Sequence, residues 1–180
     1  MALYPAVFEA DVPRAVARVA IVSVPSWLWL RHTDLSLELW PINWRAIVIG
    51  VVIVASYFGV AVAVFRPNSF SLPSDPLIWL NWIIATPIAE EILYRGITFR
   101  QLAKTMPIHR AALFSAMWFL ALHIPRWILI GRIGTTDALQ FLSSVFVFGL
   151  LLPYMVRSTG SLWSAIAVHV TNNLLGRALQ

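Results

Sequence analysis

Two adjacent carboxylates interrupt a strongly apolar stretch of the 180-residue chain. Glu90 and Glu91 are followed by Arg95 in the sequence AEEILYRG. On a helix, Glu91 and Arg95 lie four residues apart, share a face and can form an ion pair. Glu90 is rotated by about 100° from Glu91 and points in another direction. One glutamate can therefore be held ionised by the arginine, while the other faces a cavity and suits the role of general base.

Two further pairs of residues repeat the four-residue spacing in later apolar segments. Phe119 precedes His123, and His169 precedes Asn173. Histidine and asparagine side chains can donate hydrogen bonds to the oxyanion of a tetrahedral intermediate. With a glutamate as general base, this set fits hydrolysis by an activated water molecule. The same residues could instead bind zinc through Glu90, His123 and His169, although the chain has no His-Glu-x-x-His motif.

Helix packing alone can explain each of these features when it is considered singly. The glutamate–arginine pair could be a buried ion pair, His123 could lie near a helix end before Pro125, and His169 could supply a hydrogen bond between helices. However, an ionisable group at the centre of a membrane helix costs on the order of 2.5–3.5 kcal/mol. Because three separate segments carry such polar groups, a shared polar cavity is the more economical explanation.

The segments that must position these residues are apolar enough to span a membrane. The chain is 59% hydrophobic and only 12% charged, whereas soluble domains carry about 25% charged residues. Lipid cannot satisfy exposed backbone groups, so the expected fold is all-α, a polytopic membrane helix bundle of about six helices. Ser74 or Asp75 is expected to cap the third of them. The apolar segments are 15–30, 46–65, 77–102, 111–124, 138–156 and 161–179.

Composition also limits the possible functions and partners. The chain has no cysteine, which excludes disulfides, thiolate catalysis and cysteine-ligated metal centres. Its net charge of +5 comes from single basic residues between apolar segments, which favours contact with the lipid bilayer over nucleic acid. Tryptophans near segment ends, Trp82 among them, are interpreted as interfacial anchors. Arginine outnumbers lysine by 12 to 1, which indicates a bacterial protein, and we expect a multi-pass protein of the bacterial inner membrane.

In its polar motifs the chain resembles the CAAX protease and bacteriocin-processing family, also called Abi, whose eukaryotic members include the type II CAAX prenyl endopeptidase. The resemblance covers residues 75–180 and implies a protease core with four catalytic helices. Residues 1–70 would add membrane helices without a motif to the same integrated domain. The three family motifs, Glu-Glu-x-x-x-Arg, Phe-x-x-x-His and His-x-x-x-Asn/Asp, are matched in order by Glu90, Glu91 and Arg95, by Phe119 and His123, and by His169 and Asn173.

The resemblance implies an intramembrane endopeptidase that acts on a membrane-associated protein or peptide. Glu90 would activate water with the assistance of His123, while His169 and Asn173 would stabilise the oxyanion. Members of the family are described both as metalloproteases and as metal-independent glutamate proteases. Asn173 favours the glutamate mechanism, because an asparagine suits an oxyanion better than a metal, and a divalent ion such as zinc is the alternative cofactor.

The remaining matched residues would support these groups. Glu91 would order the site together with Arg95, and for this reason we count Glu91 among the catalytic residues. Phe119 and Arg95 would be supporting residues. Substitution of Arg95 should damage both fold and activity, since it would leave Glu91 buried without a partner.

Two functions without cleavage are alternatives. A small membrane transporter could use the buried charges as an ion path. A peptide-sequestering immunity protein could use the same polar cavity for binding alone. Only a protease requires Glu90 in order to produce a new peptide terminus, so cleavage distinguishes it from both alternatives.

Overall fold

The computed structural model describes residues 42–65, 70–129 and 138–178, together with a few isolated positions. Within these residues every regular element is helical and no β-strand occurs, which confirms the expected all-α class. The apolar segment at 15–30 lies outside the described residues apart from isolated positions, so its crossing of the membrane stays a prediction.

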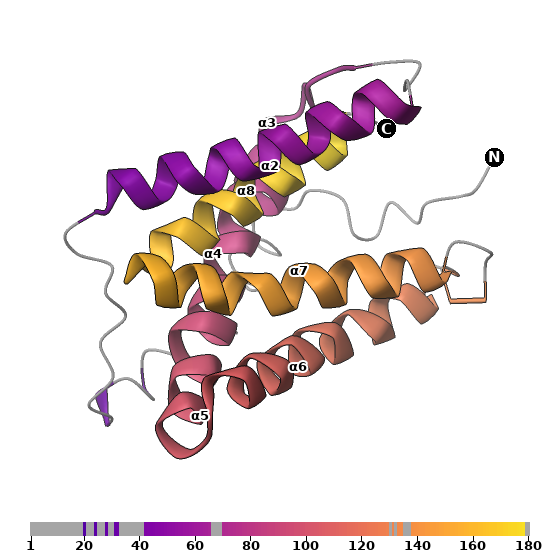
Figure 1. Cartoon of the computed structure of the whole chain (residues 1–180). Helices are drawn as coiled ribbons and strands as arrows, with labels where there is room; N and C mark the ends of the chain where they lie inside the picture. Colours follow the sequence, from indigo (N-terminus) through magenta and orange to yellow (C-terminus); the bar gives the residue numbers. More distant parts are fainter. Residues whose placement is uncertain are drawn as a thin grey trace.

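The described helices follow the predicted segments and alternate in direction along the chain (Figure 1). The first is α2 (Trp44–Phe65), and the second is a continuous helical run over Pro76–Thr105, called the motif helix below. It is followed by α6 (Ile108–Leu129), α7 (Ala138–Thr159) and α8 (Leu162–Ala178). Each of these helices coincides with a predicted apolar segment to within a few residues, except at the end of α6.

The motif helix is not a uniform α-helix, because two π-helical stretches interrupt it. Asp75, one of the two expected caps, accepts a hydrogen bond from the backbone N–H of Leu77 at 2.8 Å. The two glutamates lie in a short α-helical piece between the π-helices, and π-helical turns are frequent at functional sites. In chain order the pieces are α3 (Pro76–Ile78), η2 (Trp79–Ala85), α4 (Thr86–Glu91), η3 (Ile92–Phe99) and α5 (Arg100–Thr105).

Helix α6 differs from its prediction at the C-terminal end. The sequence predicted a short segment, 111–124, that stops at Pro125, but the helix continues through this proline to Leu129. A proline removes one N–H donor from a helix, and membrane helices tolerate the loss because neighbouring groups satisfy the freed carbonyl. His123 therefore lies inside the helix and not at its end, so an interfacial helix end does not explain this histidine.

Two glycines let helices approach one another closely. A Cβ atom on Gly50 of α2 would lie 2.8 Å from Val168 Cγ2 and 2.9 Å from the Ser164 carbonyl oxygen, both in α8. A Cβ atom on Gly149 of α7 would lie 3.1 Å from Cδ1 of Phe119 in α6. Helix α2 thus packs against α8, and α6 packs against α7. Small residues at such crossings are typical of membrane helices, whose association depends on close van der Waals contact.

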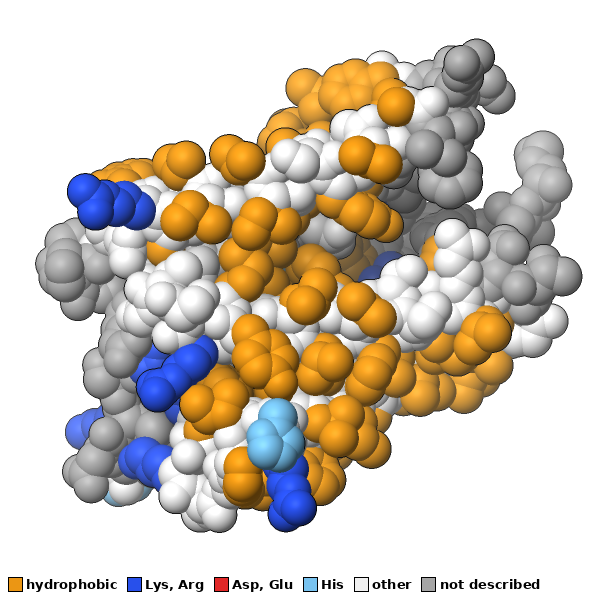
Figure 2. All heavy atoms as spheres, in the orientation of Figure 1, with side chains coloured by type: hydrophobic (Ala, Val, Ile, Leu, Met, Phe, Trp, Pro, Cys, Tyr) orange, Lys and Arg blue, Asp and Glu red, His pale blue; other side chains and the backbone are white. Residues whose placement is uncertain are grey.

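Three of the described helices are long and apolar enough to cross a bilayer, namely the motif helix, α6 and α7. Exposed hydrophobic side chains lie along α2, α6 and α7. Figure 2 shows this apolar face, on which lysine and arginine side chains gather toward one end of the bundle. Glu91 and Arg95, in contrast, are fully buried. In a membrane, a helix bundle with a polar site is expected to bury its charged side chains and to expose apolar side chains to lipid.

Candidate active site

Glu91 and Arg95 form the ion pair that their spacing predicted. Arg95 Nη1 donates a hydrogen bond to Glu91 Oε1 at 2.9 Å, and both side chains are fully buried. Arg95 Nη2 also donates to the carbonyl oxygen of Gly149 in α7 at 3.2 Å. The guanidinium carbon lies 4.5 Å from the centre of the Phe119 ring in α6. Arg95 therefore connects the motif helix to α6 and α7 through charged hydrogen bonds and a cation–π contact.

His169 of α8 joins this cluster by approaching both glutamates. Its Nδ1 lies 2.7 Å from Glu91 Oε1, the same oxygen that accepts from Arg95. Its Nε2 lies 3.7 Å from Glu90 Oε2. A carboxylate that holds one ring nitrogen fixes the orientation of an imidazole and directs the second nitrogen, here toward Glu90. The sequence predicted neither contact, because 78 residues separate Glu91 from His169.

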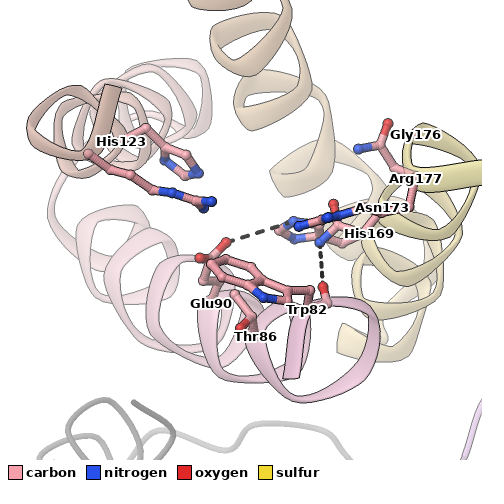
Figure 3. Close-up of a pocket in the computed structure, with 10 residues that line it drawn as sticks. Trp82, Thr86, Glu90, His123, His169, Asn173, Gly176 and Arg177 are labelled. Carbon is pink, nitrogen blue, oxygen red and sulfur yellow. Dashed lines mark hydrogen bonds and ion pairs between the residues drawn. The ribbon is translucent and has the colours of Figure 1, made fainter. Parts of the chain in front are cut away.

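Glu90 lines a polar cavity of about 250 Å³. Figure 3 shows its carboxylate directed toward His169, with His123 on another wall of the pocket. The Glu90 side chain keeps 24% of its surface exposed, whereas that of Glu91 keeps none. The two neighbouring glutamates therefore occupy different environments, as their positions on the helix predicted: Glu91 belongs to the buried ion pair and Glu90 is open to the cavity.

His123 reaches the cavity from α6, and a backbone contact fixes its tautomer. Its Nδ1 lies 2.7 Å from the carbonyl oxygen of Phe119, one helical turn earlier. A carbonyl oxygen only accepts, so Nδ1 carries the hydrogen and Nε2 of the neutral ring is an acceptor. The Phe119 and His123 rings also lie 4.5 Å apart between centres. Phe119 thus orients His123 through both its backbone and its ring.

Asn173 of α8 is held by a backbone carbonyl that the π-helix makes available. Its Nδ2 donates to the carbonyl oxygen of Trp82 at 2.9 Å. In an α-helix that oxygen would accept from the N–H of Thr86, but here the Thr86 N–H bonds the carbonyl oxygen of Asn81. The following residue, Pro87, has no N–H to offer. The π-turn and the proline therefore leave the Trp82 carbonyl open to a side chain from another helix.

Six residues on the cavity wall were not predicted to belong to the site, namely Trp82, Thr86, Arg126, Asn172, Gly176 and Arg177. The position of Trp82 near a segment end predicted an interfacial anchor, but its ring centre lies 4.3 Å from the Arg126 guanidinium carbon and 5.8 Å from that of Arg177. The spacing of residues in the sequence could have indicated two walls of the cavity. Positions 82, 86 and 90 recur every four residues on the motif helix, as do 169, 173 and 177 on α8.

A second cavity, of about 530 Å³ and mostly apolar, adjoins the polar one. Its lining includes Ile53 of α2 and Phe148 of α7. Figure 2 shows hydrophobic side chains along the recess between these two helices. His123, His169 and Asn173 line both cavities, so the apolar space leads directly to the polar groups.

The donors expected for zinc have suitable chemistry but are not gathered into a metal site. His123 and His169 each engage Nδ1 with an oxygen and can turn Nε2 toward the cavity, which is the usual arrangement of ligating histidines. In the described part of the chain, however, no group of three or more histidine, aspartate or glutamate side chains is arranged so that it could hold a metal ion. The set Glu90, His123 and His169 does not fit a metal ion as it lies here.

The fold and the site define a helical membrane protein with one glutamate, two histidines and two asparagines on the wall of a polar cavity, and with a second glutamate buried beside it. The sequence matches the family of Type II CAAX prenyl endopeptidase Rce1-like proteins over residues 72–175, more than half of the chain. The chain belongs to this protease family, which confirms the resemblance seen in its motifs, and is an integral membrane protein. No curated protein and no solved structure matches the chain significantly.

Proposed function

We propose that this protein is an intramembrane endopeptidase, in which Glu90 activates a water molecule to hydrolyse a peptide bond of a membrane-associated protein or peptide. The observation that carries the proposal is the different position of the two glutamates. Glu91 is engaged by Arg95 and His169, whereas Glu90 faces the cavity with part of its side chain exposed. A carboxylate in that position can reach both a water molecule and a substrate, as a general base must.

In the proposed reaction, water attacks the carbonyl carbon of the scissile bond. Glu90 takes one proton from the water as the new oxygen–carbon bond forms, and the carbonyl oxygen becomes the oxyanion of a tetrahedral intermediate. Collapse of the intermediate restores the carbonyl, breaks the carbon–nitrogen bond and transfers the proton from Glu90 to the leaving amine. His123 assists by accepting at Nε2 a hydrogen bond from the second O–H of the water, whose hydrogen stays on the oxygen. The products are a carboxylic acid and an amine, and Glu90 returns to its ionised form.

His169 and Asn173 are the proposed donors to the oxyanion. Asn173 uses one amide hydrogen for the Trp82 carbonyl and retains a second for the cavity. In this role His169 must carry protons on both ring nitrogens, with Nδ1–H on Glu91 and Nε2–H on the oxyanion. Donors of this kind act on charge that develops only in the transition state, and each is typically worth about 10²–10³ in rate.

The apolar cavity supports a substrate that is anchored in the membrane. Helix α2 packs mainly against α8, and the cavity lies between α2 and α7. An apolar part of the substrate can lie there while its scissile bond reaches the polar cavity through the shared wall. A multi-pass arrangement with six helices, including the segment at 15–30, and a location in the bacterial inner membrane complete the proposal.

The proposed mechanism routes no step through a metal ion. Cleavage by the purified protein should therefore persist in a chelator such as 1,10-phenanthroline. Loss of cleavage in the chelator, with recovery on addition of zinc, would support the zinc alternative instead.

The proposal is tested by comparing peptide termini in membranes by mass spectrometry. One sample carries the wild-type chain and the other Glu90→Gln, at matched expression and with equal unfolding temperatures of the purified proteins. We expect new termini only with the wild type, and their sequences would identify the substrate. Equal termini in both samples would contradict the role of Glu90. No new terminus in either sample would favour transport or peptide sequestration.

A further inference from the structure

Thr86 lies one helical turn before Glu90, on the same wall of the polar cavity. Both residues belong to α4 and line that cavity. Figure 3 shows the two side chains close together on the motif helix. Residues four apart on a helix are neighbours, with Cβ atoms about 5–6 Å apart. A single water molecule can therefore contact both side chains, and the cavity of about 250 Å³ has room for it.

The Thr86 hydroxyl is buried but has no hydrogen-bond partner among the residues that the structure describes. Thr86 is only 8% exposed, and its Oγ1 forms no hydrogen bond with the described part of the chain. A threonine in an α-helix normally donates to the carbonyl three or four residues earlier, as Thr171 does to Ala167. Thr98, in a π-helical stretch, donates to the carbonyl of Leu93, five residues earlier. A buried hydroxyl without a partner is costly, so this one is expected to serve something that enters the cavity.

The reason for the missing partner lies in the same π-turn that positions Asn173. The carbonyl four residues before Thr86 belongs to Trp82, and it accepts the Asn173 amide at 2.9 Å. One of the two carbonyls to which a helical threonine hydroxyl usually donates is thus already engaged by another helix. As a result the hydroxyl hydrogen of Thr86 remains available one turn away from the carboxylate of Glu90.

We propose that the Thr86 hydroxyl and the Glu90 carboxylate together hold the hydrolytic water. The water donates one hydrogen to Glu90 and the other to Nε2 of His123, and one of its lone pairs accepts from the Thr86 hydroxyl. The second lone pair is then left to attack the carbonyl carbon of the substrate. The number of partners is the two to four that a buried water requires. This inference rests on the proposed function and adds a residue outside the family motifs to the site.

The test compares Thr86→Val, which keeps the shape and removes the hydroxyl, with Thr86→Ser, which retains it. Thr98→Val is the matched control, because that hydroxyl serves its own helix. Purified proteins are placed in liposomes. The probe is an internally quenched peptide that carries an N-terminal hexadecanoyl chain and spans the cleavage sequence found with the wild type. Both kcat and KM are measured, together with the unfolding temperature of each protein.

We expect Thr86→Val to lower kcat by roughly 10- to 100-fold, the range for losing one hydrogen bond to a reacting group. KM should change little, since the water and not the peptide has lost a partner. Thr86→Ser should restore most of kcat. The unfolding temperature of Thr86→Val should equal or exceed that of the wild type, because an unpaired hydroxyl has been replaced by a methyl group. Thr98→Val should keep kcat.

Three results would overturn the inference, and they are distinguishable. Full kcat in Thr86→Val, in an assay in which Glu90→Gln is inactive, would refute the role of Thr86 and leave the proposed function intact. Loss of kcat in parallel with the unfolding temperature, without rescue by serine, would show that Thr86 is structural. Absence of Glu90-dependent cleavage by the wild type would refute the proposed function and the role of Thr86 with it.

Discussion

Glu91 holds His169 across two helices, with 2.7 Å between the carboxylate Oε1 and the ring Nδ1. The same oxygen accepts from Arg95 at 2.9 Å, so one buried oxygen connects a cation on its own helix to a histidine on α8. The contact directs Nε2 of His169 toward Glu90 and the cavity. The second glutamate of the motif therefore acts on the site by orienting a histidine, in addition to neutralising an arginine.

The first prediction concerns stability and follows from this buried network. Glu91→Gln should lower the free energy of unfolding by about 3–5 kcal/mol, because it leaves the fully buried Arg95 without a counter-charge. Unfolding of the purified protein by denaturant in detergent measures this change. The double variant Glu91→Met with Arg95→Met should be less destabilised than either single variant.

Glu90→Gln is the matched control for the Glu91 variant. Glu90 is the adjacent residue but retains 24% exposure, so its substitution should change the free energy of unfolding by about 1 kcal/mol or less. Activity should be lost in both variants, and only Glu91→Gln should lose stability. Equal stability losses in the two variants would contradict the different roles assigned to the glutamates.

The second prediction concerns Asn173, whose amide contacts Trp82. Asn173→Leu keeps a similar volume but removes the amide that donates to the Trp82 carbonyl and that is proposed to donate to the oxyanion. We expect kcat to fall by about 100-fold or more, as for the loss of an oxyanion donor, and the free energy of unfolding to fall by about 1 kcal/mol. Asn172→Leu, the control from the same wall, keeps the Trp82 contact and should retain more activity. If Asn172→Leu were less active than Asn173→Leu, the oxyanion donor would be Asn172 and not Asn173.

The third prediction concerns the apolar cavity between α2 and α7. Ile53 lines this cavity and Val52, its neighbour on α2, does not, although their exposures are similar at 52% and 56%. Ile53→Trp should raise KM for a membrane-anchored substrate by about 10-fold and leave kcat largely unchanged, because the ring occupies the space for the apolar part of the substrate. Val52→Trp should leave KM unchanged. Equal KM values for the two variants would exclude the α2–α7 cavity as the path of the substrate.

The fourth prediction concerns the packing of α2 on α8. Gly50→Ala would place a methyl group 2.8 Å from Val168 Cγ2 and 2.9 Å from the Ser164 carbonyl oxygen, which is backbone and cannot rotate away. The free energy of unfolding should fall by about 1–3 kcal/mol. Gly59→Ala in the same helix meets no atom within 4 Å and should stabilise the protein by up to about 1 kcal/mol through helix propensity. A tolerated Gly50→Ala would mean that α2 does not approach α8 as closely as described.

Local rules were sufficient where the deciding interaction lies within one helix. The Glu91–Arg95 pair depends on a spacing of four residues, and the Asp75 cap depends on a side chain two residues from its donor. The same kind of rule failed at Pro125, where a local stop signal was overridden because surrounding groups can satisfy the freed carbonyl. Local rules also did not predict the π-turns, which shift the backbone hydrogen bonds around Trp82.

By itself, the sequence determined the all-helical class, the helical segments and the residue types of the site, because hydropathy and helical periodicity are local properties. Only the tertiary structure decided which helices meet and which side chains then touch. The contacts of His169 with Glu91 and of Asn173 with the Trp82 carbonyl span 78 and 91 residues. They depend on how closely and at what rotation α8 packs on the motif helix, which is set by the combined packing of several helices and by no local sequence signal.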